Sequence, residues 1–300
     1  MYNMDKLYES VAERGHVCVG LDTSVEYIPE EERRRAASDA DAVLAYNKAI
    51  VDATADIAAC YKVQIACYEE MGLAGLAVYA KTLRYIRDKG ALVIADIKRG
   101  DIADTASRYA RAHFEGDFEA DFVTLTPYLG MDSIDPWLQW AEKKGKGAFV
   151  LMRTSNKGRH DFECLNIAGG GRLYDAVGDK LSDLAASHLG KHGYGAFGAV
   201  VGADPQSEEE RKEAEHIRAQ RGNLFFLIPG YGAQGGAAAD AALLLREGNG
   251  GVVNASRSIL KAWQKRCHQK RCQAPFLAPF AEAAREAAIE MRDAILAASR

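Results

Sequence analysis

Eight short apolar runs recur along this chain of 300 residues, and they constrain its fold more than any other feature. Charged, alanine-rich segments with helical spacing separate most of them, for example 73–89 and 103–114. Strands that alternate with helices in this way indicate parallel βαβ units, and near-continuous apolar strands indicate a sheet covered on both faces. The runs lie at 17–22, 57–66, 91–97, 121–126, 147–152, 197–202, 224–229 and 250–255.

The number of runs favours a closed barrel over an open doubly wound sheet. We therefore predict an α/β fold, a (β/α)8 TIM barrel, in which residues 1–300 form a single domain. A short helix should precede the first strand, and a packed helix should occupy 279–299. The fifth and sixth runs start at 147 and 197, the widest interval in the series, which predicts an insertion near 156–193 at the barrel mouth together with the fifth helix.

Composition and charge exclude several classes of protein. Lys and Arg total 38 and Asp and Glu total 42, a net charge of −4, so no global field attracts nucleic acid or an anionic membrane. The first 20 residues lack the apolar core of a secretory signal, and no apolar run reaches the roughly 18 residues of a membrane span. Six cysteines are too few for a disulfide scaffold. We expect a cytoplasmic protein without nucleic-acid or membrane partners.

Charged residues gather where the second and third strands should end. In a (β/α)8 barrel these ends form the mouth where chemistry takes place. Strand side chains alternate between faces, so Asp96 and Lys98 should share the inward face, while Lys62 comes from the second strand and Asp101 follows a glycine turn. Alternating lysines and carboxylates keep one another ionised. A plain salt bridge would explain Asp96 and Lys98 alone, but Lys62 and the loops described next favour a catalytic cluster.

A glycine-rich loop over 229–236 follows the seventh run, and Arg257 follows the eighth. The loop contains G-x-G-x-x-G, but it follows a late strand, and the acid at the spacing of a dinucleotide site, Glu247, lies in a turn; a dinucleotide site is therefore excluded. The loops after strands seven and eight are the usual phosphate site of such barrels. Glycine lets backbone N–H groups approach an anion, Arg257 supplies a fork of donors, and Gln234 adds a neutral donor.

The segment DIKRGDIADT at 96–105 resembles the D-x-K-x-x-D-I-x-x-T signature of the orotidine 5′-phosphate decarboxylase family. The order of motifs over most of the chain is similar to that of the longer bacterial subgroup, type 2. The D-x-K-x-x-D core is shared with other enzymes of the same barrel superfamily, whereas the remaining motifs are more specific. These are GLD at 20–22, YKVQIACYE at 61–69, RTSN at 153–156, PGYGAQGG at 229–236 and VNASRSI at 253–259.

This resemblance implies a cofactor-free reaction of pyrimidine biosynthesis, in which orotidine 5′-monophosphate loses CO2 and becomes uridine 5′-monophosphate. It also implies that Lys98 donates the proton to C6 of the pyrimidine. Asp96 would face the departing carboxylate, with Lys62 between the two acids. Loss of CO2 leaves an sp2 carbanion that the ring cannot delocalise well, so a fixed ammonium group beside it supplies both field and proton.

The remaining site residues are also implied by the resemblance. Asp101 would reach across a homodimer interface, together with Ile102 and Thr105, into the partner's site. Asp22 suits ribose hydroxyls, and Ser155 would contact the amide edge of the pyrimidine. The substrate-binding set is completed at the phosphate end by Pro229, Gln234 and Arg257.

Two other functions remain open from the residues. One is a Mg2+-dependent sugar-phosphate lyase or synthase that uses the same D-x-K-x-x-D core. The other is a barrel that binds uridine nucleotides without turnover. Cys267, His268 and Cys272 lack a fourth ligand at zinc-site spacing, so we expect neither a metal nor another cofactor.

Overall fold

The computed structural model describes residues 1–232, 237–265 and 280–299. Eight parallel strands form a closed barrel in chain order, with β8 paired to β1. A strand forms within each of the eight apolar runs, although β3 and β5 each extend slightly past the end of their run, and the prediction of an α/β barrel is confirmed. The strands are β1 (Val17–Gly20), β2 (Cys60–Gln64), β3 (Val93–Arg99), β4 (Phe122–Leu125), β5 (Gly147–Arg153), β6 (Phe197–Val201), β7 (Phe226–Ile228) and β8 (Gly251–Ala255).

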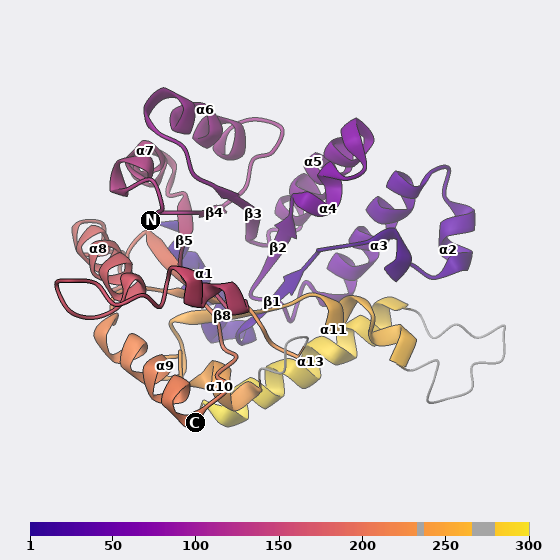
Figure 1. Cartoon of the computed structure of the whole chain (residues 1–300). Coiled ribbons are helices and arrows are strands. Elements are labelled where there is room, and N and C mark those ends of the chain that lie inside the picture. The colour runs from indigo at the N-terminus through magenta and orange to yellow at the C-terminus, as the bar shows by residue number, and fades with distance from the viewer. Residues whose placement is uncertain (233–236, 266–279, 300) are drawn as a thin grey trace.

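Helices surround the barrel (Figure 1). The yellow C-terminal helix α13 lies beside α10 and α11 and also packs on α3. The helices are α1 (Asn3–Arg14), α2 (Glu30–Arg35), α3 (Asp39–Thr54), α4 (Ala66–Glu69), α5 (Gly72–Asp88), α6 (Ala103–Phe114), α7 (Asp135–Lys144), α8 (Leu173–Ser187), α9 (Glu208–Gln220), α10 (Ala238–Ala242), α11 (Arg257–Leu260) and α13 (Phe280–Ala298), with 3-10 helices η1 (Val25–Tyr27), η2 (Met131–Ser133) and η3 (Lys157–Asp161).

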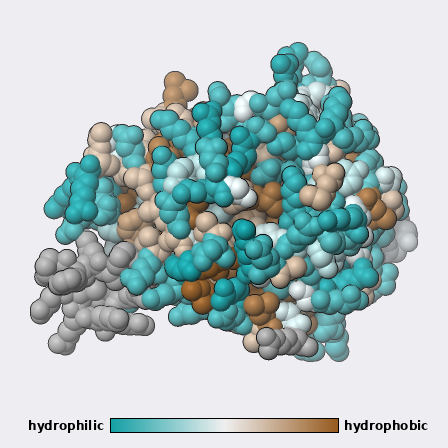
Figure 2. Space-filling model, turned by 180° about the vertical axis from the view of Figure 1, so that it is seen from behind, coloured by the Kyte–Doolittle hydropathy of each residue, from teal (hydrophilic) through white to brown (hydrophobic). Residues whose placement is uncertain are grey.

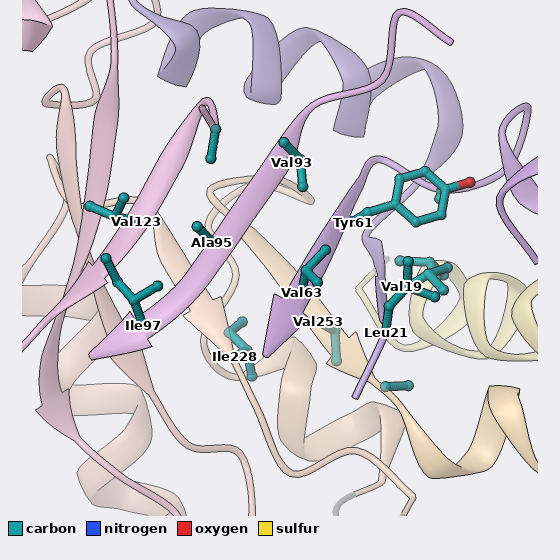
Figure 3. Packing of buried hydrophobic residues seen from close by; sticks show 14 of the residues in the cluster. Val19, Leu21, Tyr61, Val63, Val93, Ala95, Ile97, Val123, Ile228 and Val253 are labelled. Carbon is teal, nitrogen blue, oxygen red and sulfur yellow. The ribbon is translucent and has the colours of Figure 1, made fainter. Parts of the chain in front are cut away.

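Alternation along the strands separates two apolar layers. In β3, Val93, Ala95 and Ile97 belong to the layer between barrel and helices, and Figure 3 shows them in a row along the strand. Ile94 points the other way, into a barrel interior that also contains Phe122 and Phe149. A side chain that follows Ile94 by two residues therefore reaches the interior one layer nearer the mouth.

Helix α1 fills the end of the barrel where the strands begin. Its residues Met4, Leu7 and Val11 belong to the same apolar cluster as the barrel interior. Polar contacts fix the helix to the loops that precede the strands: Ser10 donates to the carbonyl of Ala59 at 2.8 Å, and the Asn3 N–H donates to the carbonyl of Gly145 at 2.6 Å. The opposite end, where the strands finish, is left for polar side chains.

The segment between β5 and β6 combines a loop with a packed helix. The loop contains η3 and a short antiparallel bridge between Asn166 and Arg172. Helix α8 follows, and it contributes Leu181 and Ala185 to the layer around the barrel. The segment therefore shares the apolar layer of the barrel.

One face of the molecular surface is mainly polar (Figure 2). On the face shown in Figure 2, hydrophilic residues predominate and hydrophobic residues form smaller areas between them. Exposed large apolar side chains nevertheless include Ile102, Tyr128, Leu129 and Phe162. Within the described residues, no helix combines the length and the apolar character needed to cross a membrane.

Candidate active site

Four charged side chains alternate in sign at the barrel mouth. Lys62 Nζ, from β2, lies 2.9 Å from Asp22 Oδ1 and 2.8 Å from Asp96 Oδ2. Lys98 Nζ lies 2.6 Å from Asp96 Oδ1, the other oxygen of the same carboxylate. Lys62, Asp96 and Lys98 therefore meet, as the sequence predicted, whereas Asp101, the fourth member of the predicted cluster, does not line the cavity within this chain. The sequence did not predict that Asp22 pairs with Lys62.

The Asp96 carboxylate is surrounded by donors. Oδ1 accepts from Lys98 and from the Thr124 hydroxyl at 2.9 Å, and Oδ2 accepts from Lys62 and from the Gln64 amide at 3.0 Å. A carboxylate offers about four lone-pair sites, so its capacity is filled. Burial raises the pKa of Asp96, but the two lysines outweigh burial and hold the pKa well below its usual range. The group therefore remains an anion.

The two lysines differ in their access to solvent. The Lys62 side chain is only 6% exposed, whereas that of Lys98 is 49% exposed. Burial lowers the pKa of Lys62, but Asp22 and Asp96 outweigh it and raise that pKa above the ordinary value. Lys62 is thus a fixed buried cation, and Lys98 is the ammonium group that a bound molecule can meet.

The backbone changes direction at Lys98. The pairing of β3 with β4 shifts register between Ala95 and Arg99. Lys98 itself has φ of +43°, in the left-handed region that a lysine seldom adopts, and Ala103 in the following loop has φ of +48°. The predicted alternation therefore applies as far as Asp96, while a local irregularity sets the direction of Lys98.

A cavity of about 380 Å³ connects the charged cluster with the phosphate loops. A second compartment of about 230 Å³ adjoins it, with an apolar floor formed by Leu151, Val200 and Leu227. The two share Lys62, Asp96, Lys98, Ser155, Pro229 and Asn254. A larger cavity of about 600 Å³ lies between α11 and α13, but the charged cluster does not line it. The chemistry belongs to the smaller, polar cavity.

The predicted phosphate end opens into the same cavity. Pro229, Gly230 and Arg257 line it, and Gly230 has φ of +107°, a conformation that requires glycine. Ser256 Oγ donates to Asp22 Oδ2 at 2.8 Å, which links this end to the charged cluster. Gln234 lies outside the described residues.

Ser155 lies in a loop with its own internal supports. Glu163 accepts from the Thr154 backbone N–H and from its hydroxyl, each at 2.8 Å. Arg159, which is buried, donates to the Ser155 carbonyl at 3.3 Å and to Glu210 at 2.7 Å. These bonds hold the loop so that Ser155 lines both compartments.

The three residues predicted to serve a partner's site are not among the residues that line these two compartments. Asp101 accepts the backbone N–H of Ile102 at 2.8 Å. Ile102 is 51% exposed, and Thr105 is also exposed. Their role across a dimer interface stays a prediction.

Several contributors were missed from the sequence, although the strand period could have indicated two of them. Gln64 lies two residues after Lys62, and Thr124 lies two residues after Phe122, which faces the barrel interior. Ser256 and Glu163 carried no comparable signal, because their partners are distant in the chain.

The described part of the chain contains no cluster of three or more His, Cys, Asp or Glu side chains suited to a metal ion. Cys267, His268 and Cys272 lie outside the described residues.

Comparison with known proteins gives a consistent result. The family model described as orotidine 5′-phosphate decarboxylase / HUMPS family matches residues 15–270. The orotidine 5′-phosphate decarboxylase of Clostridium perfringens strain 13 is 55% identical over 291 residues, which cover 97% of each chain. That of Clostridium acetobutylicum is 53% identical over 292 residues, covering 97% of this chain and 98% of the relative.

Solved structures agree with this result. The OMP decarboxylase of Leishmania donovani is 32% identical, with a TM-score of 0.73 and 99% of each chain covered. The UMP synthase of the same organism is also 32% identical, with a TM-score of 0.76. That match covers 99% of this chain and 57% of the longer one.

Proposed function

The chain belongs to the orotidine 5′-phosphate decarboxylase family, and from that membership we propose how its residues convert orotidine 5′-monophosphate to uridine 5′-monophosphate and CO2. The activity is that of a carboxy-lyase in pyrimidine biosynthesis, and the length of 300 residues fits the type 2 subgroup. One observation carries the proposal: the half-exposed ammonium group of Lys98 and the guanidinium of Arg257 line the same cavity.

Lys98 is the proton donor in this proposal. When the bond between C6 and the carboxylate breaks, its electron pair stays on C6 and CO2 leaves. A proton then passes from Lys98 Nζ to C6, so that one N–H bond breaks and one C–H bond forms. The lysine is left as a neutral amine and regains its proton from water, so the balance is one nucleotide and one proton in, and one nucleotide and one CO2 out.

Asp96 and Lys62 hold the charges that make this transfer favourable. Four donors keep Asp96 ionised, and an anion at this place opposes a second carboxylate but not neutral CO2. Lys62 balances the two acids beside it, the buried Asp96 and the partly buried Asp22. Charges that are already in position need no reorganisation when the carbanion develops.

The nucleotide spans the cavity from the phosphate loops to the apolar floor. Its phosphate binds Arg257, the N–H groups near Gly230 and, on the family's pattern, Gln234. Asp22 serves the ribose hydroxyls and Ser155 the pyrimidine amide edge. The cavity geometry supports this orientation, because Arg257 and Ser155 line the same cavity as the charged cluster.

The active form in this proposal is a homodimer. Asp101, Ile102 and Thr105 enter the partner's site, which the exposure of Ile102 on one chain supports. No cofactor takes part in the steps above. A cytoplasmic location is proposed on family membership alone.

An assay that follows the ultraviolet absorbance of the orotidine nucleotide tests the proposal. Protein treated with a chelator should consume the nucleotide and release CO2, and Lys98→Ala should lower turnover to a small residual rate. Full activity in Lys98→Ala would exclude Lys98 as the donor. Loss of turnover on chelation, with turnover of ketose phosphates only, would indicate a metal-dependent sugar-phosphate enzyme. Tight binding of uridine nucleotide without CO2 release would indicate a sensor.

A further inference from the structure

The hydroxyl group of Thr124 lies beneath the charged cluster. Thr124 belongs to β4 and is 1% exposed. Its Oγ1 accepts the backbone N–H groups of Ile97 at 3.0 Å and of Lys98 at 2.9 Å, and it donates to Asp96 Oδ1 at 2.9 Å. A hydroxyl has one proton and two lone pairs, so these three bonds use its full capacity.

This hydroxyl replaces part of the hydrogen bonding between two strands. The pairing of β3 with β4 is regular at Ala95 and resumes at Arg99, with the register shifted between them. The N–H groups of the two residues just before Arg99 both turn to one side-chain oxygen. An apolar side chain at position 124 would remove that acceptor from both, and an unpaired N–H inside a protein is costly.

The same hydroxyl influences both the backbone and the side chain of Lys98. It bonds the Lys98 backbone, where φ is +43°, and it bonds the carboxylate oxygen that Lys98 Nζ reaches at 2.6 Å. A single atom on the neighbouring strand therefore positions the main chain of Lys98 directly and its ammonium group through Asp96. A left-handed conformation persists in a lysine only where its surroundings determine it.

We propose that Thr124 is a positioning residue for the proton transfer, and that its hydroxyl holds the irregular turn of β3 that directs Lys98 toward the pyrimidine while it fixes the orientation of Asp96. The inference rests on the proposed function, in which Lys98 is the donor. Thr124 does not itself exchange protons with the substrate, because its single proton is bonded to Asp96.

Two variants separate the hydroxyl from the shape of the side chain. Thr124→Val keeps the volume and removes the hydroxyl, and Thr124→Ser keeps the hydroxyl. We expect kcat to fall about 100-fold in Thr124→Val with KM nearly unchanged, since a small misplacement of a reacting group has an effect of this order. Thr124→Ser should restore most of the activity. Thr126→Val, two residues further along, is the matched control and should retain the wild-type kcat.

A double variant tests whether the effect passes through the lysine. In the Lys98→Ala background, Thr124→Val should cause no further fall in residual kcat, because the group that it positions is gone. A purely structural role would lower the melting temperature without splitting kcat from KM. If Thr124→Val does not fold, Thr124→Cys, with a weaker donor of similar size, should still lower kcat at least tenfold at constant KM.

The outcomes distinguish this inference from the proposed function. An inactive wild type, or a fully active Lys98→Ala, overturns the proposed function. An active wild type, a severely impaired Lys98→Ala and a Thr124→Val (or Thr124→Cys) variant with wild-type kcat overturn only the positioning role of Thr124. Additive losses in the double variant do so as well.

Discussion

At the scale of single residues, the two lysines of the cluster have separate tasks. Lys62 is buried between two carboxylates, and its charge offsets theirs. Lys98 contacts one of those carboxylates but exposes half of its side chain to the cavity. Stability should therefore depend on the first lysine and turnover on the second.

Replacement of each lysine by methionine should show this division. Lys62→Met removes the buried cation between Asp96 and the partly buried Asp22, so we expect it to lower the free energy of unfolding by about 3 kcal/mol. Lys98→Met should change that energy by less than about 1 kcal/mol, since the group is half exposed, and should abolish turnover. Urea denaturation of both variants at pH 7 measures the difference. Equal destabilisation by the two substitutions would contradict the assignment.

Only some features of the charged cluster could be predicted from the sequence. The side-chain period predicted that Asp96 faces the barrel interior, because alternation along a strand is local, and the places of Lys62 and Lys98 near strand ends predicted that they lie beside it. The sequence could not predict the left-handed turn at Lys98 or the bond from Ser256 to Asp22. Both depend on atoms that a different strand brings into place.

At the scale of elements, the sequence predicts the strands more fully than it predicts the contacts of the site. The eight strands follow directly from the apolar runs, since each strand must be buried on both faces. For the loop after β5, the sequence predicted an insertion but none of its internal contacts. Its hydrogen bonds join residues whose proximity depends on how α9 packs, as in the pair of Arg159 with Glu210.

That loop should influence substrate binding more than the chemical step. Glu163→Ala removes the acceptor of both Thr154 bonds, which should loosen the segment that carries Ser155. We expect KM to rise about tenfold, equivalent to roughly 1.4 kcal/mol of lost binding, while kcat changes little. Steady-state kinetics measures both constants. The exposed Asp161→Ala in the same loop is the control, and a fall in kcat at constant KM would contradict this role.

At the scale of the whole molecule, buried histidines should set the stability in mild acid. Burial and the nearby Arg99 lower the pKa of His113 to about 4, and burial also lowers the pKa of His16. An unfolded histidine has a pKa of about 6.5. Between these two values the unfolded chain binds more protons at His113, so stability falls as the pH falls through this window.

Replacement of His113 tests this directly. Between pH 7 and pH 5 we expect His113 to account for about 2 kcal/mol of lost stability, and His113→Phe should remove that part of the slope. The His113→Phe variant should still lose some stability as the pH falls, because His16 is also buried, but the slope should be smaller. Urea denaturation across this pH range measures it, with the exposed His160→Phe as control. An unchanged slope in His113→Phe would exclude the explanation. Asp96 cannot account for this slope. Its pKa is lowered, so its contribution to stability is lost only below about pH 4.

The proposed dimer makes a prediction at the same scale. Lys98→Ala and Asp101→Ala should each be inactive alone, but mixed dimers should contain one intact site. Random exchange should then restore about a quarter of the wild-type activity, since half of the dimers are mixed and each has one of two sites intact. The test is to refold the two variants together and measure the activity, with each variant refolded alone as control. Recovery of activity would indicate a site shared between the two chains. No recovery, in dimers shown to have exchanged, would place both residues in the same chain's site.

Helix α1 blocks one end of the barrel, so among the described residues the reaction cavity opens at the other end. Nucleotide, released gas and the proton that recharges the lysine all pass through it in turn. The product must therefore leave by the opening through which the next substrate enters, so release and binding follow one another.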